Sequence, residues 1–241
     1  MKTIVAVILF SMIIPRESYG QIKLPDILNK KNKSGSGITE NEAAQGIKEA
    51  LTQGITTAVL NLNKTDGFFG SEFYKLLLPP DAKKAENTLR KLGMGAQVDK
   101  AILSINRGAE DAVGYAKPIF VEAIREMTWQ DAIKIIKGDK DDATDYFREK
   151  TKEKLIIAFT PSVKSSLDKT EATKYYADII NSYNKLPTTF KKADPDLTSY
   201  VVGKAVDALF DQIAKEEANI RANPAARTTD ILKKVFGSVI K

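Results

Sequence analysis

Three predicted helices separated by very short turns constrain the fold of this chain more than any other feature. Apolar side chains at positions 119, 120, 123, 124 and 127 share one face of a helix over 117–127. Thr128 is placed to cap a second helix, with Asp131 three residues later, and Gly138 to end it in a left-handed conformation. A third helix is expected over 143–159. Helices joined so closely must pack together, and we expect the remaining elements to pack around them.

The same helical periodicity continues from residue 38 to the end of the chain. Pro161 is expected to begin a new helix after 143–159, because proline is tolerated in the first helical turn and disrupts the interior. Gly46 and Gly54, eight residues apart in one helix, indicate that another helix crosses closely. The sequence therefore predicts an all-α fold, with residues 38–241 forming a single irregular bundle of roughly nine helices. Besides the three above, helices are expected over 38–62, 81–92, 96–113, 160–167, 170–186, 196–222 and 230–239.

The first 37 residues form two segments that we expect to precede the folded domain. Residues 1–20 combine a short positive start, an apolar run and small residues before Gln21, which is typical of a cleaved signal peptide. The run is shorter than the ~20 residues of a membrane-spanning helix, so we favour cleavage over a retained anchor. Residues 21–37 have the composition of a flexible basic linker. We therefore expect a periplasmic or secreted protein without a transmembrane segment after signal cleavage.

The 241 residues include no cysteine and no histidine. Without cysteine, disulfides and lipoprotein acylation are excluded. Without histidine, Ser–His and Cys–His nucleophile pairs and His-ligated zinc are excluded, as is the side chain best suited to proton transfer near neutral pH. Any catalysis would depend on carboxylates, lysine or tyrosine. We assign no catalytic residue, no metal site and no cofactor.

The net charge of +6 lies mainly in the N-terminal segments. Residues 1–20 carry a net +1 and residues 21–37 a net +3, which leaves +2 for residues 38–241. Because a nucleic-acid surface needs a concentrated basic patch, we expect no nucleic-acid partner. The basic linker is suited to weak attraction to anionic envelope polymer or lipid.

The stretch 64–71 interrupts the helical pattern with an Asp-Gly turn followed by two adjacent phenylalanines. Two interpretations of Phe68 and Phe69 are open: they fill a gap between helices, or the loop beginning at Asp66 flanks a pocket. The apolar run 76–78, which ends in two prolines, is expected to descend into the core.

The stretch 216–230 combines paired carboxylates, two arginines and a helix break. Glu217 and Arg221 lie four apart on one helical face, a pairing worth only ~0.3–0.5 kcal/mol if exposed. One interpretation is a polar hinge that pins a C-terminal helix. The other is a site in which Arg221 and Arg227 form a fork for a carboxylate or phosphate. The candidate ligand-binding residues of the two stretches are Asp66, Phe68, Phe69, Glu217, Arg221, Asn223, Arg227, Thr228, Thr229 and Asp230.

Several motifs carry a resemblance to a known family, among them Lys64-Thr65-Asp66-Gly67-Phe68, Leu92-Gly93-Met94-Gly95 and the run from Ile220 to Asp230. They resemble the bacterial family catalogued as domain of unknown function 4197, over residues 37–237. The resemblance implies an exported bacterial protein, often with a signal peptide or lipoprotein signal, and no established activity. This chain differs from the lipidated members because it lacks the cysteine that is acylated. The family supplies no catalytic residues.

We interpret the chain as a non-catalytic periplasmic or envelope-associated binding module. The 66–70 loop and the 216–230 segment would form its site if they meet in space. Its partner would be a small anionic ligand or an envelope protein. Such a module predicts a pocket that contains Arg221 or Arg227.

Two alternatives make different structural predictions. A carboxylate-dependent hydrolase would use Glu122 and Glu126, or Glu216 and Glu217, as acid and base. Adjacent residues of a helix point about 100° apart, which makes the second pair a poor one. A hydrolase predicts two buried carboxylates facing a cavity. A structural protein that docks on envelope components through its C-terminal helix predicts an exposed apolar patch.

Overall fold

The computed structural model describes residues 40–169, 172–185, 192 and 196–223, and all of them belong to one unit of the chain, residues 38–241. This part contains helices and no strand, which confirms the all-α class. None of its helices combines the length and the apolar composition needed to cross a membrane. The elements are, in order, α1 (Glu40–Asn63), the 3-10 helix η2 (Pro80–Ala82), α2 (Lys83–Lys91), α3 (Gly95–Val113), α4 (Ala116–Glu126), α5 (Trp129–Lys137), α6 (Asp142–Lys169), α7 (Ala172–Asn184) and α8 (Leu197–Ala222).

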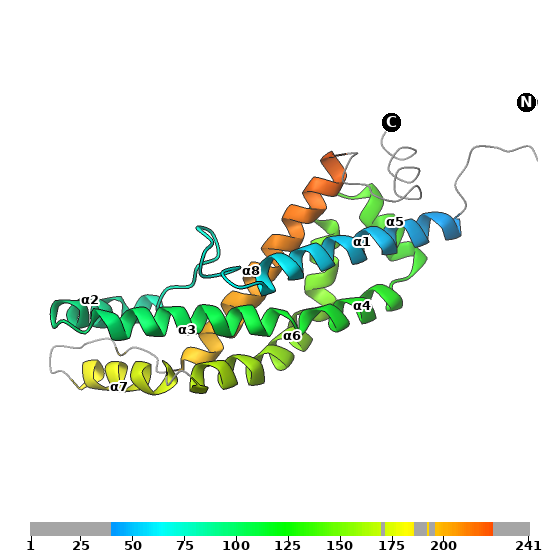
Figure 1. The fold of residues 1–241 in the computed structure, drawn as a ribbon. Coiled ribbons are helices and arrows are strands. Elements are labelled where there is room, and N and C mark those ends of the chain that lie inside the picture. Colours follow the sequence, from blue (N-terminus) through cyan, green and yellow to red (C-terminus); the bar gives the residue numbers. More distant parts are fainter. Residues whose placement is uncertain (1–39, 170–171, 186–191, 193–195, 224–241) are drawn as a thin grey trace, which may run out of the picture. The chain divides into compact units, whose positions relative to one another are not determined.

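Three long helices, α3, α6 and α8, pack on one another, and α1 packs against α8 (Figure 1). Helices α4 and α5 pack on α1 and α6, whereas α2 and α7 pack on α3. The three helices expected to organise the fold correspond to α4, α5 and α6, and only α6 lies at the centre. The reason is length: α6 has 28 residues and α8 has 26, and both bury side chains along their whole course.

Helix α6 runs through Pro161, where a new helix was expected. Proline cannot donate to the carbonyl four residues earlier, and the cost is lowest where that carbonyl can meet water. Here Pro161 lies on the exposed side and the side chain of Ile157 is 73% exposed. The helices expected over 143–159 and 160–167 are therefore one. This merger makes the described α-helices fewer than the roughly nine predicted, and the helix expected over 230–239 lies outside the described residues.

The start of α5 confirms the expected capping box. The Thr128 hydroxyl accepts the N–H of Asp131 at 3.2 Å, and Asp131 accepts the N–H of Thr128 at 3.0 Å. The end of α5 differs from expectation, because Gly138 has a φ of −84° and is not left-handed. The reason for glycine there is space: a Cβ would occupy the position of the Asp142 carboxylate, which accepts the N–H of Asp139 at 2.7 Å.

Helix α1 crosses α8 at Gly54, as the glycine spacing indicated, but the separation there does not require a glycine. A Cβ on Gly54 would lie 3.4 Å from Ile220 Cδ1 and 3.8 Å from Glu216 Cβ. These are ordinary van der Waals separations, so the crossing would admit alanine at this position.

Candidate functional site

Glu217 on α8 caps the beginning of α6 with both of its carboxylate oxygens. Oε1 accepts the N–H of Ala143 at 3.0 Å. Oε2 accepts the N–H and the hydroxyl of Thr144, at 2.9 and 2.8 Å. The first turn of a helix has N–H groups without an acceptor in the helix itself, and its dipole favours negative charge. A side chain from a distant part of the sequence therefore supplies the cap.

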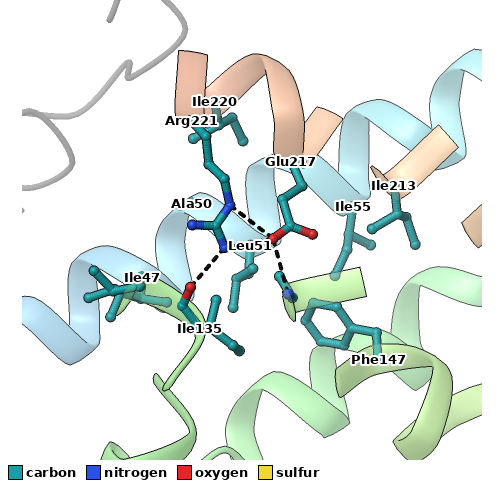
Figure 2. A pocket seen from close by; sticks show the side chains of 13 residues that line it. Ile47, Ala50, Leu51, Ile55, Ile135, Phe147, Ile213, Glu217, Ile220 and Arg221 are labelled. Carbon is teal, nitrogen blue, oxygen red and sulfur yellow. Dashed lines mark hydrogen bonds and ion pairs between the residues drawn. The ribbon is translucent and has the colours of Figure 1, made fainter. Parts of the chain in front are cut away.

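Arg221 follows Glu217 by one helical turn and binds the same carboxylate (Figure 2). Its Nε and Nη2 donate to Glu217 Oε1 at 3.1 and 2.7 Å, and Nη2 also donates to the carbonyl of Ile135 in α5 at 2.7 Å. The two side chains are 18% and 7% exposed, so this pair is interior and not the surface pair that its spacing alone suggests. Together the two residues join α8, α6 and α5.

A small apolar cavity lies beside this ion pair, between α1, α5, α6 and α8 (Figure 2). Its volume is about 40 Å³. Pockets for drug-sized ligands have volumes of roughly 300–1,000 Å³, whereas ~10–15 Å³ holds one water. The cavity therefore has room for the end of a side chain and not for a whole ligand. Its walls include Ile47, Leu51, Ile55, Ile136, Phe147 and Ile220.

The loop residues singled out from the sequence surround a second buried glutamate, Glu110 on α3. Its Oε1 accepts the N–H groups of Phe68 and Phe69 at 3.1 and 3.2 Å, and its Oε2 accepts Arg107 Nη1 at 2.6 Å. Arg107 also donates to Asp66 at 2.7 Å, and its guanidinium lies 5.8 Å from the centre of the Phe69 ring. Glu110 and Arg107 thus fix the loop to α3.

The two phenylalanines of this loop have different surroundings. Phe68 is fully buried and its ring lies 6.4 Å from that of Tyr74, so it fills a gap between elements. Phe69 is half-buried, with the ammonium of Lys75 4.2 Å above its ring. The gap-filling interpretation therefore describes Phe68.

The structure places the candidate residues in separate settings. Glu217 and Arg221 lie at the cavity, whereas the residues of the 66–70 loop lie around Glu110. Asn223 ends α8, its N–H donating to the Asn219 carbonyl at 2.8 Å. The remaining candidates, Arg227, Thr228, Thr229 and Asp230, lie outside the described residues.

Each of the almost fully buried carboxylates in the described ranges is paired with an arginine. Glu86 accepts Arg90 Nε at 3.1 Å, in the same way as Glu110 and Glu217 accept their arginines. The carboxylates considered as acid–base candidates are more accessible: Glu122 and Glu216 are half-buried and Glu126 is exposed. Glu217 lines the cavity, but donors of the protein itself occupy both of its oxygens.

A much larger groove, of about 840 Å³, runs between residues 73–83 and one face of α8. Aromatic, aliphatic and charged side chains line it, including Tyr200, Lys204 and Asp207 of α8. Phe73 and Leu77 are 83% and 50% exposed on its other wall. In size and in its mixture of apolar and charged side chains, this groove resembles a ligand-binding site.

Tyr74 lies in this groove at the centre of a polar network. Its hydroxyl is 2.7 Å from Asp211, 2.9 Å from the side-chain oxygen of Gln212 and 2.7 Å from the ammonium of Lys215, which donates to it. Burial raises the pKa of the Tyr74 phenol, so the hydroxyl stays protonated and can donate its one hydrogen to Asp211 or to Gln212. Burial also raises the pKa of Asp211, but hydrogen bonds from Lys215 and Tyr74 outweigh it and lower the pKa overall. The network therefore holds a charged Lys215–Asp211 pair at one wall.

Sequence reasoning missed the groove because it treated the apolar run before the two prolines as core. Leu76 and Leu78 are buried as expected, but Leu77 points outward. Asn106 holds the extended segment, accepting the N–H of Leu76 and donating to its carbonyl, both at 2.8 Å. The sequence did contain a signal for the groove, because the two prolines exclude a helix. Side chains of an extended segment alternate between two sides, which places Leu77 opposite to Leu76 and Leu78.

The comparison with protein families is consistent with this all-helical unit. Residues 37–237 match the family model described as "Protein of unknown function (DUF4197)". No curated protein and no solved structure matches the chain. The family match covers most of the chain and every helix described above. The chain therefore belongs to the family of domain of unknown function 4197.

Proposed function

We propose that this protein is a non-catalytic binding module of the bacterial envelope, and that its ligand occupies the groove between residues 73–83 and α8. The observation that carries the proposal is the groove itself: about 840 Å³, with Phe73 and Leu77 exposed on one wall. Large side chains of this kind on the surface mark binding sites when they gather beside a concave surface.

The charges of the groove favour a ligand with an apolar part and an anionic group. Two of its lysines already have acidic partners, Lys83 with Glu86 and Lys215 with Asp211. Lys75 and Lys204 add two positive charges and Asp207 adds one negative charge, so the four lysines of the lining exceed its three carboxylates by one. An anionic amphiphile would contact the exposed apolar side chains and these ammonium groups together.

The arrangement of the buried glutamates supports a role without catalysis. A general acid or base needs an oxygen within hydrogen-bond reach of the substrate. Glu110 and Glu217 instead accept backbone N–H groups at one or both oxygens and bind an arginine as well. They hold the fold together, which argues against the carboxylate-dependent hydrolase.

The groove is tested by native mass spectrometry of protein purified from the bacteria that make it. We expect an additional bound mass in the natural protein and its loss in the double variant Phe73→Ser, Leu77→Ser. The matched control is Ile157→Ser, which removes an equally exposed apolar side chain from α6. Retention of the bound mass by the groove variant, or its loss in the control alone, would exclude the groove as the site.

Export is the second part of the proposal and has its own test. The composition of residues 1–20 supports removal of a signal peptide before Gln21. Intact mass measurement of the protein from the envelope fraction should show a chain that begins at Gln21. A chain that retains residues 1–20 in the cytoplasmic fraction would refute export and leave the groove proposal standing.

A further inference from the structure

A second pocket of ligand size, the serine pocket, lies where the ends of α1 and α3 meet the side of α6. Its volume is about 420 Å³, within the roughly 300–1,000 Å³ of small-molecule sites. Helix α6 lines it with Ala158, Pro161 and three serines, whose short side chains leave the space open. The described lining also includes Asn63, Asp111, Tyr115 and Lys169. Unlike the cavity beside Glu217 and the groove along α8, this pocket has a mainly polar lining.

The chemistry of the lining favours a neutral ligand with many hydroxyl groups. One negative charge, on Asp111, balances one positive charge, on Lys169. The hydroxyls of Ser162 and Ser165 can each donate and accept a hydrogen bond. The hydroxyl groups of a sugar have the same double capacity, so sugar and lining can pair in either direction. An anion would gain from Lys169 and be repelled by Asp111.

The two planar polar side chains of the pocket have capacity for a ligand. Asp111 Oδ2 lies 3.5 Å from the hydroxyl of Ser166, which is long for a hydrogen bond between oxygens. A carboxylate offers about four acceptor sites, so Asp111 can also accept hydroxyl groups of a ligand. Asn63 Nδ2 donates to the carbonyl of Glu110 at 2.7 Å, which fixes the amide at the end of α3. Gly114 leaves room for it there, because a Cβ on this glycine would lie 3.0 Å from Asn63 Nδ2.

Tyr115 supplies an aromatic wall. Its side chain is 57% exposed although it lines the pocket. Its N–H donates to the carbonyl of Ala112 at 3.0 Å, which fixes the residue between α3 and α4. A sugar ring carries C–H groups on its faces and hydroxyls around its edge. Tyrosine can therefore pack against the face of the ring while polar neighbours bind the edge.

We propose that the serine pocket binds a neutral saccharide, with one sugar ring against Tyr115 and its hydroxyl groups bound by Asp111 and the serines of α6. Most of these residues belong to helices, which hold polar groups more precisely than loops do. The inference does not rest on the groove proposal, because the serine pocket and the groove have no described lining residue in common.

NMR titration of the full-length, ¹⁵N-labelled protein tests the proposal. The probes are two neutral disaccharides, maltose and N,N′-diacetylchitobiose, with inorganic phosphate as the anionic comparison. We expect saturable shifts of the amides of Tyr115, Ser162 and Ser165 with at least one disaccharide, and the responding probe distinguishes a plain from an N-acetylated sugar. Absence of shifts with both disaccharides would overturn the proposal. Shifts with phosphate alone, or sugar-induced shifts confined to the groove residues Tyr200 and Lys204, would also overturn it.

Two variants separate the contributions of the aromatic wall and the carboxylate. Tyr115→Ala and Asp111→Ala should each weaken disaccharide binding on the order of tenfold, because one removes the packing surface and the other a charged acceptor. The matched controls are Leu92→Ala and Glu153→Ala, which remove an exposed apolar side chain and an exposed carboxylate outside the pocket. These should bind as the natural protein does. Unchanged binding in both pocket variants, with spectra that show a folded protein, would contradict the assignment.

Discussion

Glu217 and Glu110 make the same kind of contacts at two different places in the structure. Each is a buried glutamate on a long helix that accepts two consecutive backbone N–H groups from a distant segment, and each binds an arginine of its own helix. Glu217 on α8 binds the first turn of α6, and each of its two oxygens accepts one N–H group of that turn. The one on α3 captures a loop, and a single oxygen accepts both N–H groups.

The arginines differ more than the glutamates. Arg221 is 18% exposed and also donates to a carbonyl of α5, so its charge lies between α5, α6 and α8. Arg107 is 34% exposed and also donates to Asp66 at the surface. The two sites therefore differ in the burial of the arginine: Glu217 and Arg221 form an interior junction between helices, whereas Glu110 and Arg107 attach a surface loop.

The largest expected effect comes from Glu217→Gln. An amide has only one acceptor oxygen, so its NH₂ group must face either Thr144 or the donors of Ala143 and Arg221, and in both cases the buried arginine loses its carboxylate partner. Breaking a buried ion pair in this way costs about 3–5 kcal/mol of unfolding free energy, measured by urea denaturation.

Glu110→Gln is the matched variant for this comparison. The amide oxygen can still accept the N–H groups of Phe68 and Phe69, and Arg107 can turn toward Asp66 and water. We expect a loss of only about 1–1.5 kcal/mol, as for one hydrogen bond. Equal losses for the two variants would contradict the distinction between an interior junction and a loop attachment.

Glycine substitutions extend the comparison to the backbone near each site. A Cβ on Gly67, in the loop held by Glu110, would lie 2.8 Å from the carbonyl oxygen of Asn61 and even closer to that of Leu62. Gly67→Ala should therefore destabilise by roughly 1–3 kcal/mol, like other overpacked sites. Gly54→Ala, at the crossing beside Glu217, should stabilise by roughly 0.5–1 kcal/mol, because its Cβ meets only ordinary contacts. Thermal unfolding of both variants decides whether the signs differ as expected.

An exposed carboxylate provides a small effect that depends on pH. Hydrogen bonds from the Thr128 hydroxyl and N–H lower the pKa of Asp131 below its ordinary 3.8. A carboxyl with a lowered pKa stabilises the folded state above that ordinary value, and the contribution is lost as pH falls through the lowered pKa. Thr128→Ala should cost about 1 kcal/mol at neutral pH and less in acid. Urea denaturation at neutral pH and in acid measures the loss of unfolding free energy in the variant. The same loss at both pH values would contradict this assignment.

The parts of the fold that depend on local sequence were predictable. The capping box at Thr128, the left-handed Gly93 after α2 and the end of α8 before Pro224 follow from neighbouring residues alone. The continuous α6 was missed because the cost of Pro161 depends on which side of the helix faces water, and tertiary packing decides that.

The sites were less predictable than the helices. The spacing of Glu217 and Arg221 is that of an ordinary surface pair, and nothing local shows that the first turn of α6 lies against them. Glu110 was not selected for the same reason, since its partners at 68 and 69 are about forty positions earlier in the chain. Contacts between distant segments give these carboxylates their roles, and such contacts are not encoded in any one stretch.

The most direct test of Glu217 as the cap of α6 is amide hydrogen exchange at Ala143 and Thr144, measured by NMR. First-turn amides lack an acceptor in their own helix and would otherwise exchange rapidly. The natural protein should protect both amides as strongly as the helix interior. Glu217→Gln keeps a single acceptor oxygen, so it should abolish the protection of at least one of them while leaving Phe68 and Phe69 protected. Rapid exchange of Ala143 and Thr144 in the natural protein, or unchanged protection in the variant, would contradict the account.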